Sequence, residues 1–251
     1  TKEIIERYKP GANITYCYNP EKGKVPALNL GLSQVKTDYY FVCAGDDILS
    51  KDYVKINLEL LQRNNFKFLY NSFREFYQPY ADKTLPEKGG HENVHQYTFG
   101  ELLTGNKVHG YIFASSEVIK VLYPLTQGLP FEDWYIAFKL CKVYGSCPKN
   151  MQPTFLYRKH TGSDSANFQR NREKFIFLIR RDRNLFQFML QDAVFSENEK
   201  RLFRQKMLLF ENMLSYNPLK VLQIIGSRHF NGREKFKSVF YPFIKRMKYK
   251  K

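Results

Sequence analysis

The sequence predicts an α/β fold, in which helices flank a mixed sheet, followed by an α-helical C-terminal region. Short apolar runs typical of buried strands alternate with amphipathic helical segments in the first two thirds of the chain. Beyond about residue 170 the apolar periodicity becomes wholly helical. This change predicts two units, an α/β domain over residues 1–168 and a helical, basic region over residues 169–251.

Each element of the first unit is expected from its own pattern. Ile4, Ile5 and Tyr8 share a helical spacing, whereas residues 39–43 (YYFVC) form a continuous apolar run typical of a strand buried on both faces. The polar stretch 78–96, rich in Pro and Gly, is typical of a surface loop. In chain order we expect helices over 1–9, 26–36, 51–63, 98–105, 115–122 and 132–144, and strands over 14–18, 39–43, 66–73, 108–114 and 154–158. In the second unit, residues 171–192 and 197–214 are expected as long amphipathic helices.

Composition excludes several classes of protein. The 22 Phe and 18 Tyr among 251 residues are too many for a disordered chain. No apolar run is long enough to span a bilayer, and no charged-then-apolar leader opens the sequence. The 40 Lys and Arg against 24 Asp and Glu give a net charge of +16, which attracts nucleic acid, anionic lipid or a phosphorylated substrate without choosing among them.

The basic residues are densest in the C-terminal segment 228–251, where aromatic residues are interleaved with them. One interpretation is a solvated basic helix or tail. The other is a segment on an anionic membrane surface, with its rings in the headgroup layer and its cations on phosphates. The sequence leaves both open.

The four cysteines lack the spacing of a metal site. Cys17, Cys43, Cys141 and Cys147 are scattered without a CxxC pair, which argues against zinc and favours a reducing, cytoplasmic compartment. Because Cys43 ends an apolar run, we expect a buried thiol there.

Two adjacent carboxylates, Asp46 and Asp47, follow Gly45 at the end of a predicted buried strand. Ligands of open α/β sheets bind beyond the carboxyl ends of strands, and neighbouring carboxylates are costly there unless a cation neutralises them. Oxygen ligands suit Mg²⁺ or Mn²⁺. The alternative is a turn in which Asp47 caps the next helix.

A second acidic pair, Glu132 and Asp133, precedes Trp134 at the start of a predicted helix. Carboxylates are favourable at a helix N-terminus, so a cap is one interpretation. The other is a general base that deprotonates an incoming hydroxyl.

A basic cluster, Arg158, Lys159 and His160, ends the predicted strand 154–158. It is either plain surface or a site at which the cations meet phosphate oxygens and the imidazole meets a metal. His109, beside Gly110 and next to an apolar strand, is more typical of a packed core residue than of a ligand.

These segments occur in a characteristic order. They are Asn19…Gly23…Asn29, Gly45-Asp46-Asp47, Glu132-Asp133-Trp134 and Tyr157-Arg158-Lys159-His160. The order resembles that of the family 2 glycosyltransferases, which have a GT-A (Rossmann-like) fold, and the resemblance covers about residues 1–168.

The resemblance implies roles for individual residues. Metal binding, of Mn²⁺ or Mg²⁺, is implied for Asp46, Asp47 and His160, and catalysis for Asp133 as the base with Glu132 beside it. Contacts to the nucleotide and its diphosphate are implied for Gly23, Lys24, Asn29, Arg158 and Lys159. We expect His109, Gly110 and Trp134 in the pocket for the acceptor or donor sugar.

The sequence departs from the family pattern at three places. Ala44 replaces the first acid of the commoner metal motif, and Leu28 stands where an Arg often precedes Asn29. The chain also opens on the helix expected over 1–9, without the strand–helix–strand unit that normally precedes it, so we expect an N-terminally incomplete GT-A domain.

The resemblance implies a metal-dependent, inverting transfer of a sugar from a nucleotide-diphosphate sugar to a glycan or lipid-linked acceptor in surface polysaccharide biosynthesis. We expect the protein in the cytoplasm, peripheral on the inner face of a bacterial membrane, and without a nucleic-acid partner. The alternatives are a basic nucleic-acid-binding protein, against which no helix-turn-helix or RNA-binding pattern is found, and an inactive GT-A scaffold. The oligomeric state is left open.

Overall fold

The computed structural model describes residues 2–8, 13–77, 93–130, 132–159, 172–214, 218–226, 232 and 235–236. Within them a mixed six-stranded sheet has the order β1-β5-β3-β6-β2, and β4 also pairs with β6. The strands are β1 (Tyr39–Phe41), β2 (Ile48–Leu49), β3 (Phe68–Tyr77), β4 (Val94–Tyr97), β5 (Ile112–Ser115) and β6 (Cys147–Lys159). The long strands β3 and β6 are parallel, and the other pairs are antiparallel. The predicted α/β class with a mixed sheet is confirmed.

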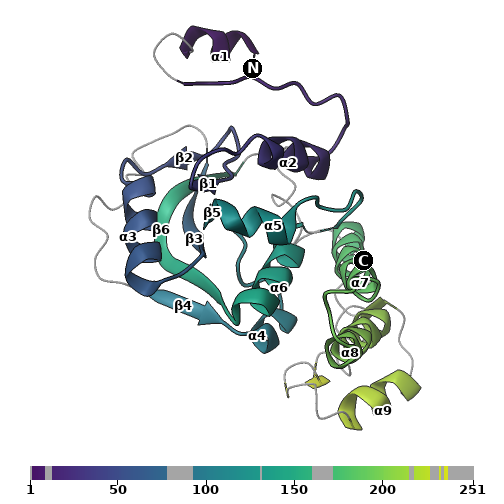
Figure 1. Ribbon diagram of the computed structural model, residues 1–251. Coiled ribbons are helices and arrows are strands. Elements are labelled where there is room, and N and C mark those ends of the chain that lie inside the picture. The colour runs from purple at the N-terminus through teal and green to yellow at the C-terminus, as the bar shows by residue number, and fades with distance from the viewer. Residues whose placement is uncertain are drawn as a thin grey trace.

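Helices cover both faces of the sheet (Figure 1). One face carries α3 (Tyr53–Asn64), whose apolar side packs on Leu69, Phe113 and Phe155. The opposite face carries the shorter helices and α6, and the C-terminal helices lie outside α6. These are α4 (Phe99–Leu103), α5 (Ile119–Leu122), α6 (Glu132–Tyr144), α7 (Arg172–Met189), α8 (Glu197–Leu214) and α9 (Pro218–Gly226).

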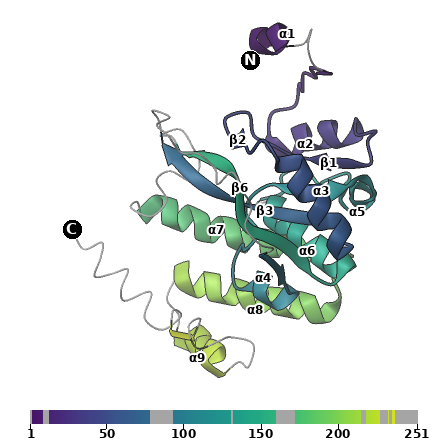
Figure 2. The same ribbon diagram turned by 90° about the vertical axis from the view of Figure 1, so that its left-hand side faces the viewer.

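The N-terminal helices lie at one end of this arrangement. Helix α2 (Lys24–Ser33) contributes Val25 and Leu32 to the core. Helix α1 (Lys2–Tyr8) has no buried residue and lies apart from the rest of the molecule in both views (Figure 2).

The core on the α6 side is aromatic and continuous with the C-terminal helices. Phe138 of α6, Phe186 of α7 and Phe203 of α8 are fully buried, with ring centroids 5.6–6.0 Å apart. Buried aromatic pairs in tilted and edge-to-face arrangements add stabilisation to the area they bury. The helical region and the α/β domain therefore share one core. The predicted boundary near residue 168 lies outside the described residues.

A buried polar network marks the centre of the sheet. The Asn71 side chain of β3 donates to Asn57 Oδ1 of α3 (2.8 Å) and accepts from Thr154 Oγ1 of β6 (2.9 Å). Asn57 also donates to the Tyr53 carbonyl at 2.7 Å. The register between β3 and β6 shifts at residues 71–73, so these side-chain bonds join the two strands where their ladder is irregular.

Most expected elements are present, with four corrections. Residues 14–18 are not a strand, because they are largely exposed and pair with no strand of the described chain. Residues 94–97, taken partly as loop, form β4, and the two-residue β2 was not expected. Cys43 is exposed rather than buried, because β1 ends at Phe41.

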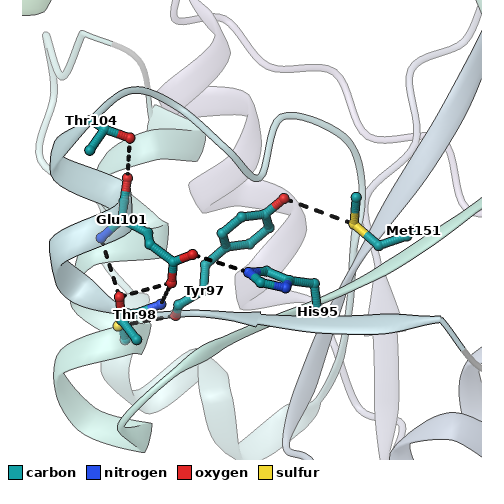
Figure 3. Close-up of polar contacts among 7 residues, drawn as sticks. His95, Tyr97, Thr98, Glu101, Thr104 and Met151 are labelled. Carbon is teal, nitrogen blue, oxygen red and sulfur yellow. Dashed lines mark hydrogen bonds and ion pairs between the residues drawn. The ribbon is translucent and has the colours of Figure 1, made fainter. Parts of the chain in front are cut away.

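Helix α4 begins with a capping box, drawn in Figure 3. The Thr98 backbone N–H donates to Glu101 Oε2 (2.8 Å), and the Glu101 N–H donates to Thr98 Oγ1 (3.2 Å). His95 of β4 lies 3.2 Å from Glu101 Oε1. Hydrogen bonds from the Thr98 backbone and hydroxyl, together with His95, hold the pKa of Glu101 below its usual value. The box fixes α4 to the end of β4.

We expect Thr98→Ala to lower the free energy of unfolding by about 1 kcal/mol at pH 7, because one end of α4 loses its cap. The contribution of the Glu101 carboxylate to the free energy of unfolding is present above the unfolded-state pKa of about 4.5. It is lost as pH falls through the lower folded-state pKa. Urea unfolding at a series of pH values measures both effects. Thr98→Ser keeps the hydroxyl and should match the wild type; equal stability of Thr98→Ala would contradict the role of the cap.

Candidate active site

Asp47 is tied into the fold by both of its carboxylate oxygens. Oδ1 accepts from the Arg158 backbone N–H of β6 at 2.8 Å, and Oδ2 accepts a short bond from the Tyr111 hydroxyl. The same hydroxyl accepts from the Ala44 N–H at 2.7 Å. Asp47 therefore fixes the turn after β1 against β6, whereas its neighbour Asp46 is exposed on that turn.

The second acidic pair begins α6, as predicted. Glu132 is buried, 7% exposed, and forms an ion pair with Lys24 at the start of α2. Asp133 is half-buried and accepts from Asn106 Nδ2 (2.8 Å) and from the Trp134 N–H (2.9 Å). The two carboxylates thus have different partners, a cation for Glu132 and neutral donors for Asp133.

The environment of Asp133 favours its protonated form. Burial raises the pKa of Asp133, and the neighbouring Glu132 carboxylate raises it further. The hydrogen bond from Asn106, the charge of Lys24 and the Trp134 N–H oppose this rise. A half-buried carboxylate with a raised pKa at the start of a helix suits a general base.

A single segment, residues 105–111, joins the two acidic pairs. At its start Asn106 contacts Asp133, and at its end Tyr111 contacts Asp47. The segment turns at Gly105 (φ +152°) and Gly110 (φ +132°). A Cβ on Gly110 would lie closer than 3.0 Å to the backbone oxygen of Asn71 in β3. Only glycine therefore allows the segment to approach β3 this closely.

The predicted nucleotide-site residues have mixed surroundings. Gly23 (φ +130°) turns the chain into α2, beside a pocket of about 390 Å³ lined by residues 18–21 and the first turns of that helix. Asn29 lines the pocket, but its amide donates to the Leu125 carbonyl and accepts from the Leu125 N–H, both at 2.8 Å. The Asn29 amide thus holds α2 against the backbone of Leu125. Lys24, expected at the diphosphate, is bound to Glu132 instead.

The cations at the end of β6 also differ from each other. Lys159 forms an ion pair with Glu75 at 3.1 Å and lies 5.1 Å from the Tyr157 ring centroid, so its charge is offset by a carboxylate. Arg158 Nε is buried and has no hydrogen-bond partner among the described residues. Arg158 is the better candidate to receive an anion. His160 lies outside the described residues.

The predicted sugar-pocket residues separate into core and surface. Trp134 is 3% exposed, packs on Phe138 and donates its indole N–H to the Leu102 carbonyl, so its ring belongs to the core and not to an open pocket. His109 is exposed, with Nδ1 3.2 Å from the Asn106 carbonyl, so its interpretation as a packed core residue is wrong, whereas its place in a sugar pocket stays a prediction.

The described residues contain no group of three or more His, Cys, Asp or Glu side chains that could hold a metal ion. This does not conflict with a cation bound through substrate, because Mg²⁺ commonly takes one or two carboxylates and completes its shell with phosphate and water. The exposed Asp46 fits such a ligand. Asp47 fits less well, because both of its oxygens already accept hydrogen bonds.

Sequence reasoning missed three residues that shape this site. Tyr111 anchors Asp47, Asn106 contacts Asp133, and Lys149 contacts the segment between them. Gly105 and Gly110, which begin and end the stretch GNKVHG, could have indicated this segment. Glycines mark backbone that must turn or approach its neighbours closely.

We expect Gly110→Ala to lower the free energy of unfolding by on the order of 3 kcal/mol or more, because the new Cβ meets both a positive φ and the Asn71 carbonyl. Gly31→Ala is the matched control. Gly31 lies within α2, where an added Cβ would have no atom within 4 Å, so the alanine should leave the free energy of unfolding unchanged or raise it. Denaturant unfolding of both variants decides, and wild-type stability of Gly110→Ala would contradict the close approach.

Part of the chain is similar to a known family. Residues 1–119 match the model of glycosyl transferase family 2. Uncharacterized glycosyltransferases of Rickettsia felis and Rickettsia conorii are each 29% identical over 98 residues, 39% of this chain. The matched stretch spans only 15% of the length of those relatives.

Solved structures agree on the fold. The crystal structure of S. aureus TarS 1–349 superposes with a TM-score of 0.50 and 14% sequence identity, covering 89% of this chain and 62% of the TarS chain. The crystal structure of TarS 1–349 in complex with UDP-GlcNAc also gives a TM-score of 0.50, with 13% identity, and covers 95% of this chain and 66% of the TarS chain. The fold is therefore GT-A, and residues 1–119 of the chain are similar to glycosyl transferase family 2.

Proposed function

We propose that the protein is an inverting glycosyltransferase in which Asp133 is the catalytic base. The observation that carries the proposal is the Asp133 carboxylate, held by Asn106 at the start of α6 in surroundings that raise its pKa. The match of residues 1–119 to the model of glycosyl transferase family 2 supports a sugar transfer, and the UDP-GlcNAc complex of TarS supports a nucleotide-diphosphate sugar as the donor.

In the proposed reaction Asp133 takes the proton of the acceptor hydroxyl. The hydroxyl oxygen forms a bond to the anomeric carbon as the bond from that carbon to the diphosphate oxygen breaks, and the electron pair leaves with the diphosphate. Asp46 would hold a Mn²⁺ or Mg²⁺ ion, whose charge neutralises the leaving group. Arg158, whose buried Nε lacks a partner among the described residues, would receive a phosphate oxygen.

We expect Asp133→Asn in the full-length protein to lower kcat for sugar transfer at least about 10²-fold, because the amide cannot accept the proton. Donor binding should stay near the wild type. A panel of nucleotide sugars assayed with Mn²⁺ measures transfer, and calorimetry measures nucleoside diphosphate binding. Asp46→Asn should instead weaken the Mn²⁺-dependent binding.

The matched control is Asp52→Asn, an exposed carboxylate just before α3, which should leave both readings unchanged. Full transfer activity in Asp133→Asn would contradict the proposed base. Tight, salt-sensitive binding of an oligonucleotide together with no diphosphate binding would favour the nucleic-acid alternative.

We also propose that the C-terminal region binds an anionic membrane, where the acceptor is a lipid-linked or polymeric glycan. No helix in the described part of the chain is long and apolar enough to cross a bilayer. Support comes from segment 228–251, with nine Lys or Arg and one acid, and from Leu222 and Ile225, which are 65% and 43% exposed on α9. Apolar side chains beside a basic segment suit a headgroup layer.

We expect the protein to sediment with phosphatidylglycerol vesicles and not with phosphatidylcholine vesicles, and to be released by raised salt. Leu222→Ser should weaken the binding, because it removes an apolar contact. Val143→Ser, at an exposed position of α6 (49% exposed), is the control. Equal binding to both lipids, or none to either, would contradict the proposal.

A further inference from the structure

Lys149 of β6 is a buried cation that faces backbone carbonyls. It is 6% exposed, and its ammonium donates to the carbonyls of Lys107 (3.0 Å) and His109 (3.4 Å). Among the described residues no carboxylate forms an ion pair with it. Burial lowers the pKa of Lys149. Burying an ammonium group without a carboxylate partner costs free energy of folding. Packing alone does not explain why a lysine occupies this position.

The segment that Lys149 contacts is the same one that carries Asn106. The Asn106 side-chain oxygen accepts from the Val108 N–H (3.2 Å), which turns its NH₂ group toward Asp133 (2.8 Å). Its backbone carbonyl lies 3.2 Å from His109 Nδ1. The carbonyls of residues 106, 107 and 109 therefore all have side-chain partners, and the orientation of the Asn106 amide is fixed by the loop itself.

We propose that Lys149 and Asn106 are positioning residues for Asp133: the Lys149 ammonium anchors loop 105–110 to β6, and Asn106 on that loop fixes the orientation of the carboxylate. The proposal rests on the proposed role of Asp133 as the base. Each Asp133 oxygen accepts one bond from the protein, which leaves lone pairs for the acceptor hydroxyl.

Several charged and titratable groups surround Asp133 and bear on its ionisation. Glu132 precedes it on α6, Lys24 faces it from α2, Tyr70 of β3 donates to its backbone carbonyl at 3.5 Å, and His109 lies on the loop. The Asn106 hydrogen bond lowers the pKa of Asp133. Loss of that bond should therefore raise the pH at which the base becomes ionised.

The test compares the pH dependence of kcat in full-length wild type, Asn106→Ala, Lys149→Met and the double variant. We expect Asn106→Ala to lower kcat about tenfold or more and to leave the donor KM within about twofold. It should also move the acidic limb of the pH profile of kcat to higher pH. Lys149→Met should move the limb in the same direction. The double variant should not exceed the larger single effect, because the two residues act in series.

Lys67→Met is the control, because Lys67 bonds to Glu117 at the surface and lies in no part of the loop. If Lys149→Met does not fold, Lys149→Gln replaces it, because its shorter amide cannot span the same contacts. A Lys149 variant that lowers only the melting temperature, with kcat and the limb at wild-type values, would overturn the proposal.

A second readout separates this proposal from the proposed function. Selective ¹³C labelling of aspartate carboxyl groups, with the Asp133 signal assigned from its loss in Asp133→Asn, follows the Asp133 titration without turnover. If no donor is turned over by the wild type, a raised midpoint in Asn106→Ala and Lys149→Met still supports the positioning role. An unchanged midpoint in both variants refutes it.

Discussion

The close approach of Gly110 to the Asn71 carbonyl is the contact on which the candidate site depends. It allows residues 105–111 to lie close against β3, with Asn106 in contact with Asp133 and Tyr111 in contact with Asp47. A side chain at Gly110 would push the segment away from β3 and separate both contacts. The relative position of the two acidic pairs is therefore set by backbone packing and not by the acids themselves.

Strand β6 supports this arrangement through three polar contacts. Its Lys149 ammonium holds the middle of the segment, its Thr154 hydroxyl holds Asn71, and its Arg158 N–H holds Asp47. β6 also pairs with β3 along most of its length and with β2 and β4. Because paired strands resist bending, the three polar contacts hold the segment 105–110, Asn71 and Asp47 in fixed positions relative to one another.

Sequence reasoning predicted the fold class and the start of α6 because both depend on local signals, apolar periodicity and acids at a helix N-terminus. It could not predict partners that come from distant parts of the chain. Asn29 looked like a nucleotide contact, but it pairs with Leu125, 96 residues away. Trp134 was predicted as a pocket residue beside the acids, but its ring packs on Phe138 and on Phe186 of α7 in the core. Residues 14–18 have the composition of a strand, but no described strand pairs with them.

The contrast between Glu132 and Asp133 shows how one pair of adjacent carboxylates can serve two purposes. Lys24 of α2 gives Glu132 a partner of opposite charge. Asp133 receives only neutral donors, and burial together with Glu132 raises its pKa. Different surroundings are one way in which proteins give adjacent carboxylates different properties. The ion pair with Lys24 on α2 thus distinguishes Glu132 from Asp133.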